Sequence, residues 1–386
     1  WLKHLSLHSG PCFFELPLSQ HIGELILRGL AQLHGRLGMG FNGMFLQHWR
    51  LAGCPPLPHS LAMHSAELPS GALCGREPDA VADFAGIRAV ASDMDGTFLR
   101  PDHEAPAANL EAVRQVEELG LHFLFCTGRN RASAQARLRD AVNLSTRPGV
   151  FLNGAAVYGK SGSIIHERTV SVDVVVDMLG YAKAHSGKFS VVLCHGDAHF
   201  VSDLEERWAL HLHKDYDDPE PSSLGGYAAA ISTFRGASGG TEPPQKAPRR
   251  REPHLLHFIG SREDLDAGRE RLEALAGGRV KFVRALPTCL TLLHPLCSKA
   301  DGLEAALKEF GSTLSEAIAF GDAENDVEML QGVKIGVAMG NAMPTVKECA
   351  RWHCAANSAE PPGVAQVLAD LLSFVNARGE TQGGQS

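Results

Sequence analysis

The stretch SDMDGTFL, residues 92–99, directly follows the short apolar run IRAVAS, residues 87–92. The apolar run is typical of a buried parallel strand, so Asp93 and Asp95 come at the carboxyl end of that strand. Open α/β sheets bind their ligands at this edge. Two carboxylates placed there are costly unless they bind a cation or take part in a reaction. An Asx-type turn would explain one aspartate but not the whole string.

The segments around this stretch alternate between strands and helices. Residues 106–120 have apolar positions at helical spacing and end in glycine, and LHFLFC at 121–126 predicts a second buried strand. The pattern then predicts a helix over 131–141 and a strand over 149–152. It returns after residue 297 with helices at 303–310, 326–331 and 363–375 and strands at 317–320 and 334–338. This order predicts an α/β fold, a Rossmann-like parallel sheet with right-handed crossovers.

The residues between the two alternating halves predict an inserted α/β cap domain over 161–296. Its expected strands are 190–194, 198–202, 255–259, 280–283 and 290–293, with a helix over 262–275. The low-complexity stretch 236–252 is expected to be a disordered surface loop. The core is then expected over 86–160 and 297–376, followed by a flexible tail over 377–386.

Residues 1–85 differ from the rest because they are poor in charged side chains and rich in histidine. They begin with Trp1, and we expect a targeting segment, a linker or an artefact of the reading frame, with a folded domain as a minor alternative. The expected location is the cytoplasm, or an organelle if this leader is a transit segment.

The composition of the chain excludes several classes of protein. Its 386 residues are 44% hydrophobic and 21% charged, which is ordinary for a globular protein and excludes collagen, coiled coil and bulk disorder. The net charge of −8 argues against a nucleic-acid partner. No apolar run is long enough for a transmembrane helix. Nine scattered cysteines without a CxxC pair indicate reduced thiols.

Two further polar motifs also come directly after expected strands, as the aspartates at 93 and 95 do. Thr127 comes after the second strand, where its hydroxyl could cap a helix or hold a phosphate. Asp322 and Asp326 follow the strand at 317–320. Hard oxygen ligands with no neighbouring His or Cys favour Mg²⁺ over zinc. Lys299, just before a helix, would by itself be read as a solvated surface residue.

Four histidines in the middle of the chain are weaker candidates for a site. His195 and His199 lie around a turn, and His211 and His213 are two apart on one face of a possible strand. No Cys/His spacing completes a tetrahedral metal site, so surface or cap histidines are the better interpretation.

The four motifs, in this order, resemble those of the haloacid dehalogenase-like (HAD) hydrolase superfamily, and above all its Cof-type subfamily (IIB). The resemblance covers residues 86–376 and includes FLNGA at 151–155, GVAMGNA at 336–342 and GVA at 363–365. It implies a HAD core with a large cap between the second and third motifs, and a Mg²⁺-dependent phosphatase activity on a small phosphorylated metabolite.

The resemblance also implies a role for each motif residue. Asp93 would be the nucleophile that forms an aspartyl phosphate. Asp95 would protonate the leaving alkoxide and then activate water. Thr127 and Lys299 would hold the phosphoryl oxygens. The implied metal ligands are Asp93, Asp95 through its backbone carbonyl, Asp322 and Asp326. The implied substrate-binding residues are Gly128, Arg129, Asn153, Gly154 and Asn325.

Asp95 discriminates between activities inside the superfamily, because a phosphatase must protonate an alkoxide and a dehalogenase need not. The expected substrates are of the sugar phosphate, FMN or pyridoxal phosphate class. One alternative is a sugar phosphomutase or another phosphotransferase. A remote alternative is a non-catalytic phosphate-binding protein, which would be expected to have lost motif residues that this chain retains.

Overall fold

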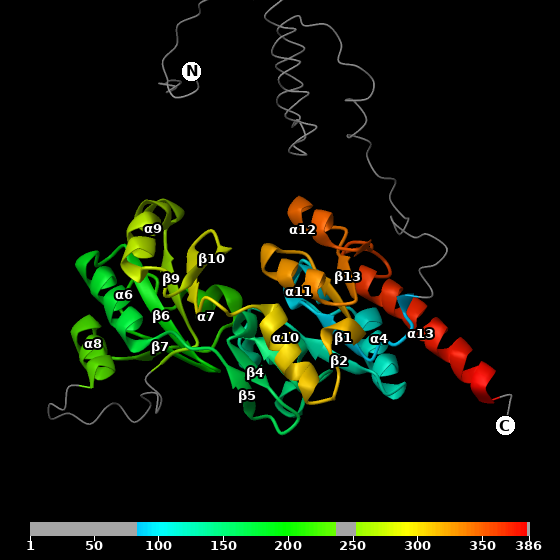
Figure 1. Cartoon of the computed structure of the whole chain (residues 1–386). Coiled ribbons are helices and arrows are strands. Elements are labelled where there is room, and N and C mark those ends of the chain that lie inside the picture. The colour runs from blue at the N-terminus through cyan, green and yellow to red at the C-terminus, as the bar shows by residue number, and fades with distance from the viewer. Residues whose placement is uncertain (1–82, 237–251, 384–386) are drawn as a thin grey trace, which may run out of the picture. The chain divides into compact units, whose positions relative to one another are not determined.

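The computed structural model describes residues 83–236 and 252–383 (Figure 1). Nearly all of the expected leader at 1–85 and of the expected loop at 236–252 lies outside the described residues. The described fold begins before residue 86, because Phe84 is 2% exposed and its ring lies 5.2 Å from that of Trp352. Asp83 also pairs with Arg351 at 2.8 Å.

A five-stranded parallel sheet forms the core, in the order β14-β13-β12-β1-β2. Its strands are β1 (Ala89–Ser92), β2 (His122–Phe125), β12 (Ala317–Gly321), β13 (Ile335–Ala338) and β14 (Trp352–His353). Ala89 is in register with Ala317 on one side and with His122 on the other, so β1 lies between the two sequence halves. The predicted α/β fold with a Rossmann-like parallel sheet is confirmed.

Helices connect these strands and bury them. The core helices are α4 (Ala107–Glu118), α5 (Arg131–Leu138), α10 (Lys299–Lys308), α11 (Val327–Gly332), α12 (Pro344–Cys349) and α13 (Gly363–Gly383). Side-chain caps start two of them: Asn130 accepts from Ser133 N before α5, and Ser298 accepts from Asp301 N before α10. Helix α13 continues to Gly383, past the core boundary expected at residue 376.

The prediction that residues 149–152 form a third strand of the parallel sheet is wrong. Strand β3 (Gly149–Phe151) pairs antiparallel with β4 (Ala156–Tyr158), which pairs with β5 (Ile164–Glu167) in a separate small sheet. The structure records a single parallel bridge, Cys126–Val150, between β3 and the chain that follows β2. Positive φ angles at Leu152, Asn153 and Gly154 reverse the chain directly after β3, which explains the antiparallel pairing.

A six-stranded sheet, in the order β10-β11-β9-β6-β7-β8, is formed inside the interval expected for the cap. Its strands are β6 (Phe189–His195), β7 (Ala198–Val201), β8 (Ser222–Ser223), β9 (Leu255–Gly260), β10 (Lys281–Leu286) and β11 (Cys289–Leu293). Helices α6 (Val172–Ala184), α8 (Tyr227–Arg235) and α9 (Arg262–Ala276) share a buried apolar cluster with it.

The expectation of a strand at His211 and His213 is wrong, because both lie in the short helix α7 (His211–Tyr216). There each histidine has its own partner: His211 Nε2 lies 2.8 Å from Thr288 Oγ1, and His213 Nδ1 lies 2.7 Å from Asp218 O. Among the described helices, none has the length and apolar character needed to cross a membrane.

Candidate active site

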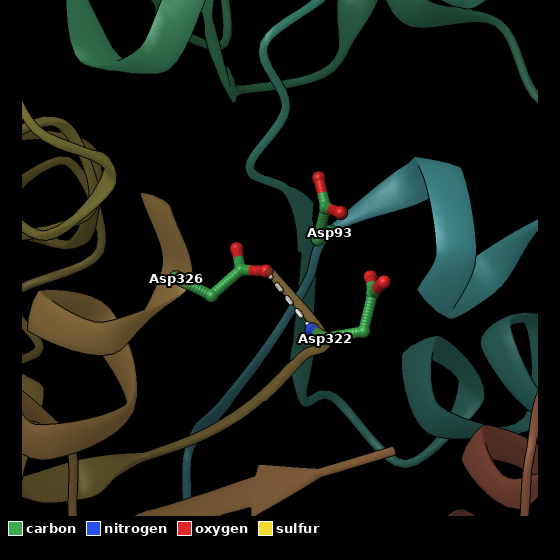
Figure 2. Close-up of side chains that lie close together, drawn as sticks. All are labelled: Asp93, Asp322 and Asp326. Carbon is green, nitrogen blue, oxygen red and sulfur yellow. Dashed lines mark hydrogen bonds between the residues drawn. The ribbon is translucent and has the colours of Figure 1, made fainter. Parts of the chain in front are cut away.

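Three carboxylates meet at the carboxyl edge of the central sheet (Figure 2). Asp93 follows β1, and Asp322 and Asp326 follow β12, the neighbouring parallel strand. One carboxylate oxygen of each lies within 4.8 Å of the others. Parallel strands end at the same edge, so this topology brings together side chains that are more than 200 positions apart in the sequence.

One glycine allows the loops after β1 and β12 to approach each other, and a second allows the loop after β12 to fold back on its own strand. Gly96, in the turn Met94–Phe98, has a φ of +78°, and a Cβ there would lie 2.2 Å from Asp322 Oδ2. At Gly321 a Cβ would lie 2.4 Å from the Cβ of Asp326. Thr97 Oγ1 then donates a hydrogen bond of 2.7 Å to Asp322 Oδ1. A side chain at Gly96 would collide with Asp322, and one at Gly321 would collide with Asp326.

Lys299 brings a positive charge into this cluster from the first residue of α10. Its Nζ lies 2.5 Å from Asp93 Oδ1 and 2.7 Å from Asp326 Oδ1, and the residue is 1% exposed. A lone lysine would by itself be expected at the surface, but this fold buries Lys299. Gly154 packs closely on Ser298, the residue before Lys299, because a Cβ at Gly154 would lie 2.0 Å from Ser298 O.

Asp326 is completely buried and holds its own loop. Its Oδ2 accepts hydrogen bonds of 3.0 Å from the backbone N–H groups of Asp322 and Ala323, the first of which is the dashed line in Figure 2. Its Oδ1 accepts from Lys299. Asp326 therefore fixes both the position of Asp322 and that of the lysine.

Negative charge exceeds positive charge in this buried cluster. Burial raises the pKa of Asp93 well above its usual range; Lys299 opposes this shift, and the carboxylates of Asp326 and Asp322 add to it. Burial also raises the pKa of Asp322 to about 6, against the hydrogen bond from Thr97. Burial by itself would lower the pKa of Lys299, but its two carboxylate partners raise it.

The donor set of this cluster fits a small divalent cation. Carboxylate oxygens are the ligands that Mg²⁺ prefers, and a cation would compensate the charge that burial makes costly. One oxygen of each carboxylate lies within 4.8 Å of the others, and Figure 2 shows the three side chains gathered at this edge of the sheet. Among the described residues, no other group of His, Cys, Asp or Glu is placed to hold a metal.

Asp95 is held by a fork of hydrogen bonds from Arg129. Arg129 Nε donates to Asp95 Oδ2 and Arg129 Nη2 donates to Asp95 Oδ1, both at 2.7 Å. His103 Nδ1 lies 3.1 Å from Asp95 Oδ1. Burial opposes ionisation of Asp95, but Arg129 and His103 lower its pKa on balance. Arg129, one of the expected substrate-binding residues, thus contacts the expected acid.

The remaining expected site residues form a chain of contacts beside the cluster. Thr127 is 1% exposed, and its Oγ1 accepts from Arg129 N at 3.1 Å. Asn153 N donates to Thr127 O, and Asn325 Nδ2 donates to Asn153 Oδ1 at 2.9 Å. A Cβ at Gly128 would lie 3.3 Å from the Asn153 side chain. These contacts hold the loops that follow β2, β3 and β12 together.

Sequence reasoning assigned no role to three residues that contact the site. Thr97 donates to Asp322, His103 contacts Asp95, and Asn341 Nδ2 donates to Gly96 O at 2.7 Å. Thr97 and Asn341 lie inside motifs that the sequence already singles out, so a signal for them existed. His103 lies in a polar turn and gives no such signal.

Comparison with known proteins gives a consistent result over this whole region. The family model described as haloacid dehalogenase-like hydrolase matches residues 90–368, which include every motif above. An HMP-PP phosphatase of Yersinia pestis is 28% identical over 292 residues, covering 74% of this chain and 96% of its own length.

Two further matches are more distant or partial. A protein of Arabidopsis thaliana called Endoribonuclease YBEY, chloroplastic, is 25% identical over 67% of this chain, which spans only 42% of that relative's length. A haloacid dehalogenase-like hydrolase from Bacteroides thetaiotaomicron has a similar structure, with a TM-score of 0.61, 21% identity and coverage of 73% of this chain and 98% of its own.

Proposed function

Since the chain belongs to the haloacid dehalogenase-like hydrolase family, we propose that it is a Mg²⁺-dependent phosphatase that hydrolyses a small phosphorylated metabolite. The observation that carries the proposal is the placement of Lys299 between Asp93 and Asp326, with Asp322 beside them. Phosphoryl transfer depends on positioning and on charge neutralisation more than on other covalent machinery, and this cluster offers both.

In the first step Asp93 attacks phosphorus in line and forms an aspartyl phosphate while the bond to the leaving oxygen breaks. Arg129 and His103 favour the ionised form of Asp95 in the free site. The anionic phosphate group that binds beside Asp95 opposes this shift, so the carboxylate takes up a proton on binding and gives it to the leaving oxygen. Lys299 keeps the Asp93 carboxylate oriented and neutralises charge on the phosphoryl oxygens. Mg²⁺, held by Asp93, Asp322 and Asp326 with the backbone carbonyl of Asp95, would supply further positive charge to the transferring group.

In the second step Asp95, now a carboxylate, takes a proton from water. The water attacks phosphorus, inorganic phosphate leaves, and the Asp93 carboxylate is regenerated. Thr127 would hold a phosphoryl oxygen, and Gly128, Asn153, Gly154 and Asn325 would shape the loops around the bound group.

The substrate class is proposed from the relatives and from the cap. The HMP-PP phosphatase relative matches over nearly its whole length, which supports a phosphorylated small molecule. Sugar phosphates, FMN and pyridoxal phosphate remain the candidates. An inserted domain that covers the site would exclude water and select among them.

The test is a steady-state assay of the full chain against a panel of phosphorylated metabolites, with Mg²⁺ and with EDTA. We expect Mg²⁺-stimulated release of inorganic phosphate, and loss of it in Asp93→Asn. The matched control is Asp177→Asn, because Asp177 pairs with Arg279 inside the cap, at 2.7 Å. Full turnover in EDTA or in Asp93→Asn would overturn the proposal, and an isomeric product without phosphate release would indicate a mutase.

A further inference from the structure

The cap contacts the core at the start of helix α5. Arg129 Nη1 donates to the carbonyl oxygen of Tyr216 at 3.2 Å, and Ala132 N donates to Asp197 Oδ1 at 2.9 Å. Between them, Asn130 Nδ2 lies 3.3 Å from both His199 Nε2 and Asp218 Oδ1. Consecutive residues of one loop and the first helical turn therefore bind two segments of the cap.

Opposite charges face each other across this contact. On the core side, Arg131 lies 3.4 Å from Asp197 Oδ2, and Arg137 lies 2.5 Å from Asp217 Oδ2. Both arginine side chains are mostly buried, 21% and 19% exposed. Asp218 adds a third cap carboxylate, attracted by Arg129. Their partners Asp197 and Asp217 are 34% and 58% exposed, so the pairs favour a docked cap and salt screens them in part.

Arg129 belongs to this contact and to the catalytic site at the same time. One edge of its guanidinium binds both oxygens of Asp95, while Nη1 binds Ser133 Oγ at 2.9 Å and the cap carbonyl of Tyr216. The side chain is 9% exposed. Because a guanidinium is a rigid plane, the group that meets the cap also sets the direction of the Asp95 carboxylate.

We propose that Arg129 is a positioning residue that orients Asp95 when the cap is docked on α5, and that the Asp197–Arg131 and Asp217–Arg137 pairs hold the cap there. This inference rests on the proposed phosphatase function. Undocking the cap to admit substrate removes the Tyr216 carbonyl from Arg129 and loosens its hold on Asp95. Redocking restores both, so the acid is in place when the site is covered.

The first test separates an effect on Asp95 from a general loss of structure. An alkyl phosphate needs a proton on its leaving oxygen, whereas p-nitrophenolate leaves without one. We expect Arg129→Ala to lower kcat/KM for an alkyl phosphate by about a hundredfold and for p-nitrophenyl phosphate by less than about threefold, in the pattern of Asp95→Asn. Arg129→Lys, which keeps the charge but loses the fork, should show a smaller selective loss.

The second test addresses the cap. The double variant Asp197→Asn/Asp217→Asn should show the same selective loss for the alkyl phosphate, and added salt should reduce the wild-type rate toward it. Asp177→Asn is the matched control, because its ion pair with Arg279 lies within the cap. The double variant Arg137→Asp/Asp217→Arg reverses the charges of one pair. It should hydrolyse the alkyl phosphate faster than either single variant, because the ion pair forms again.

The outcomes distinguish this inference from the proposed function. An equal loss with both substrates in Arg129→Ala and Arg129→Lys, or an unchanged substrate ratio in the Asp197/Asp217 double variant, overturns the coupling and leaves the phosphatase proposal intact. Undiminished turnover in Asp93→Asn overturns the phosphatase proposal itself.

Discussion

Lys299 Nζ lies 2.5 Å from Asp93 Oδ1, although the two residues are 206 positions apart in the sequence. The ammonium group also contacts Asp326, so two buried carboxylates share one buried cation. The charge balance of the candidate site therefore depends on this single side chain in the absence of a metal.

Lys299→Met should destabilise the protein strongly, because it leaves two buried carboxylates without their cation. We expect the free energy of unfolding to fall by about 3–5 kcal/mol, and kcat to fall by about a hundredfold or more. Urea denaturation in EDTA measures the first. Lys308→Met, at the exposed end of the same helix beside Glu304, is the control and should cost less than about 1 kcal/mol. Equal costs for the two variants would contradict this prediction.

The contribution of Asp322 to stability should fall as pH rises through the acid range, and Mg²⁺ should reverse this loss. The pKa of Asp322 is raised from 3.8 to about 6 in the folded protein. Between these values the unfolded chain binds fewer protons than the folded one, so the free energy of unfolding decreases with pH and the penalty is complete above about pH 6.

A divalent cation binds the ionised carboxylate and competes with the proton at low pH. Thermal unfolding should therefore show a larger increase of Tm on adding Mg²⁺ at pH 7.5 than at pH 5. Asp322→Asn should reduce both the pH dependence and the Mg²⁺ effect. The same increase of Tm at both pH values would contradict the assignment of this carboxylate to the cation site.

Gly96→Ala should damage the site more than its backbone strain explains. The positive φ alone costs about 1–2 kcal/mol, and the new Cβ would also lie 2.2 Å from Asp322 Oδ2. Gly120→Ala is a matched control, since Gly120 has a φ of +76° with nothing within 4 Å of an added Cβ. We expect both variants to lose stability but only Gly96→Ala to lose phosphatase activity and the Mg²⁺-dependent shift of Tm. Similar activities for the two would contradict the close approach.

Phe84→Ala should show that the fold begins upstream of its first strand. Phe84 packs against Trp352 and Phe374 with ring centroids 5.2 and 6.0 Å away. Truncating a buried aromatic side chain costs about 3–5 kcal/mol, which urea denaturation would measure. Leu119→Ala, at a residue that is 37% exposed, is the control and should cost far less. A negligible cost for Phe84→Ala would place the boundary after residue 86.

The sequence predicted the parts of the site that local pattern determines. Asp93 and Asp322 each follow an apolar run, and short buried runs next to turn residues identify strand ends in a parallel sheet. The meeting of these residues follows from topology once β1 and β12 are neighbours. For the same reason the α/β class was predictable from the alternation of segments.

The parts that the sequence did not predict depend on contacts with distant segments. The run GVFL at 149–152 has the composition of a buried parallel strand, but the reversal at Asn153 sends it into an antiparallel pair. Arg129 at a helix start resembles many surface arginines, and its pairing with Asp95 depends on how two loops approach. The helix at His211 is only six residues long and has no periodicity that could identify it.

Strand β1 directly precedes Asp93, and the ribosome synthesises the two strands that pair with β1 at very different times. Its partner β2 follows within about 30 residues, but β12 is made only after the whole cap has emerged. At about 5–20 residues per second the ribosome needs roughly ten to forty seconds to cover that distance. For most of that interval the nascent chain carries the candidate nucleophile without Lys299, and for all of it without Asp322 and Asp326, so no competent site exists until the cap has been made.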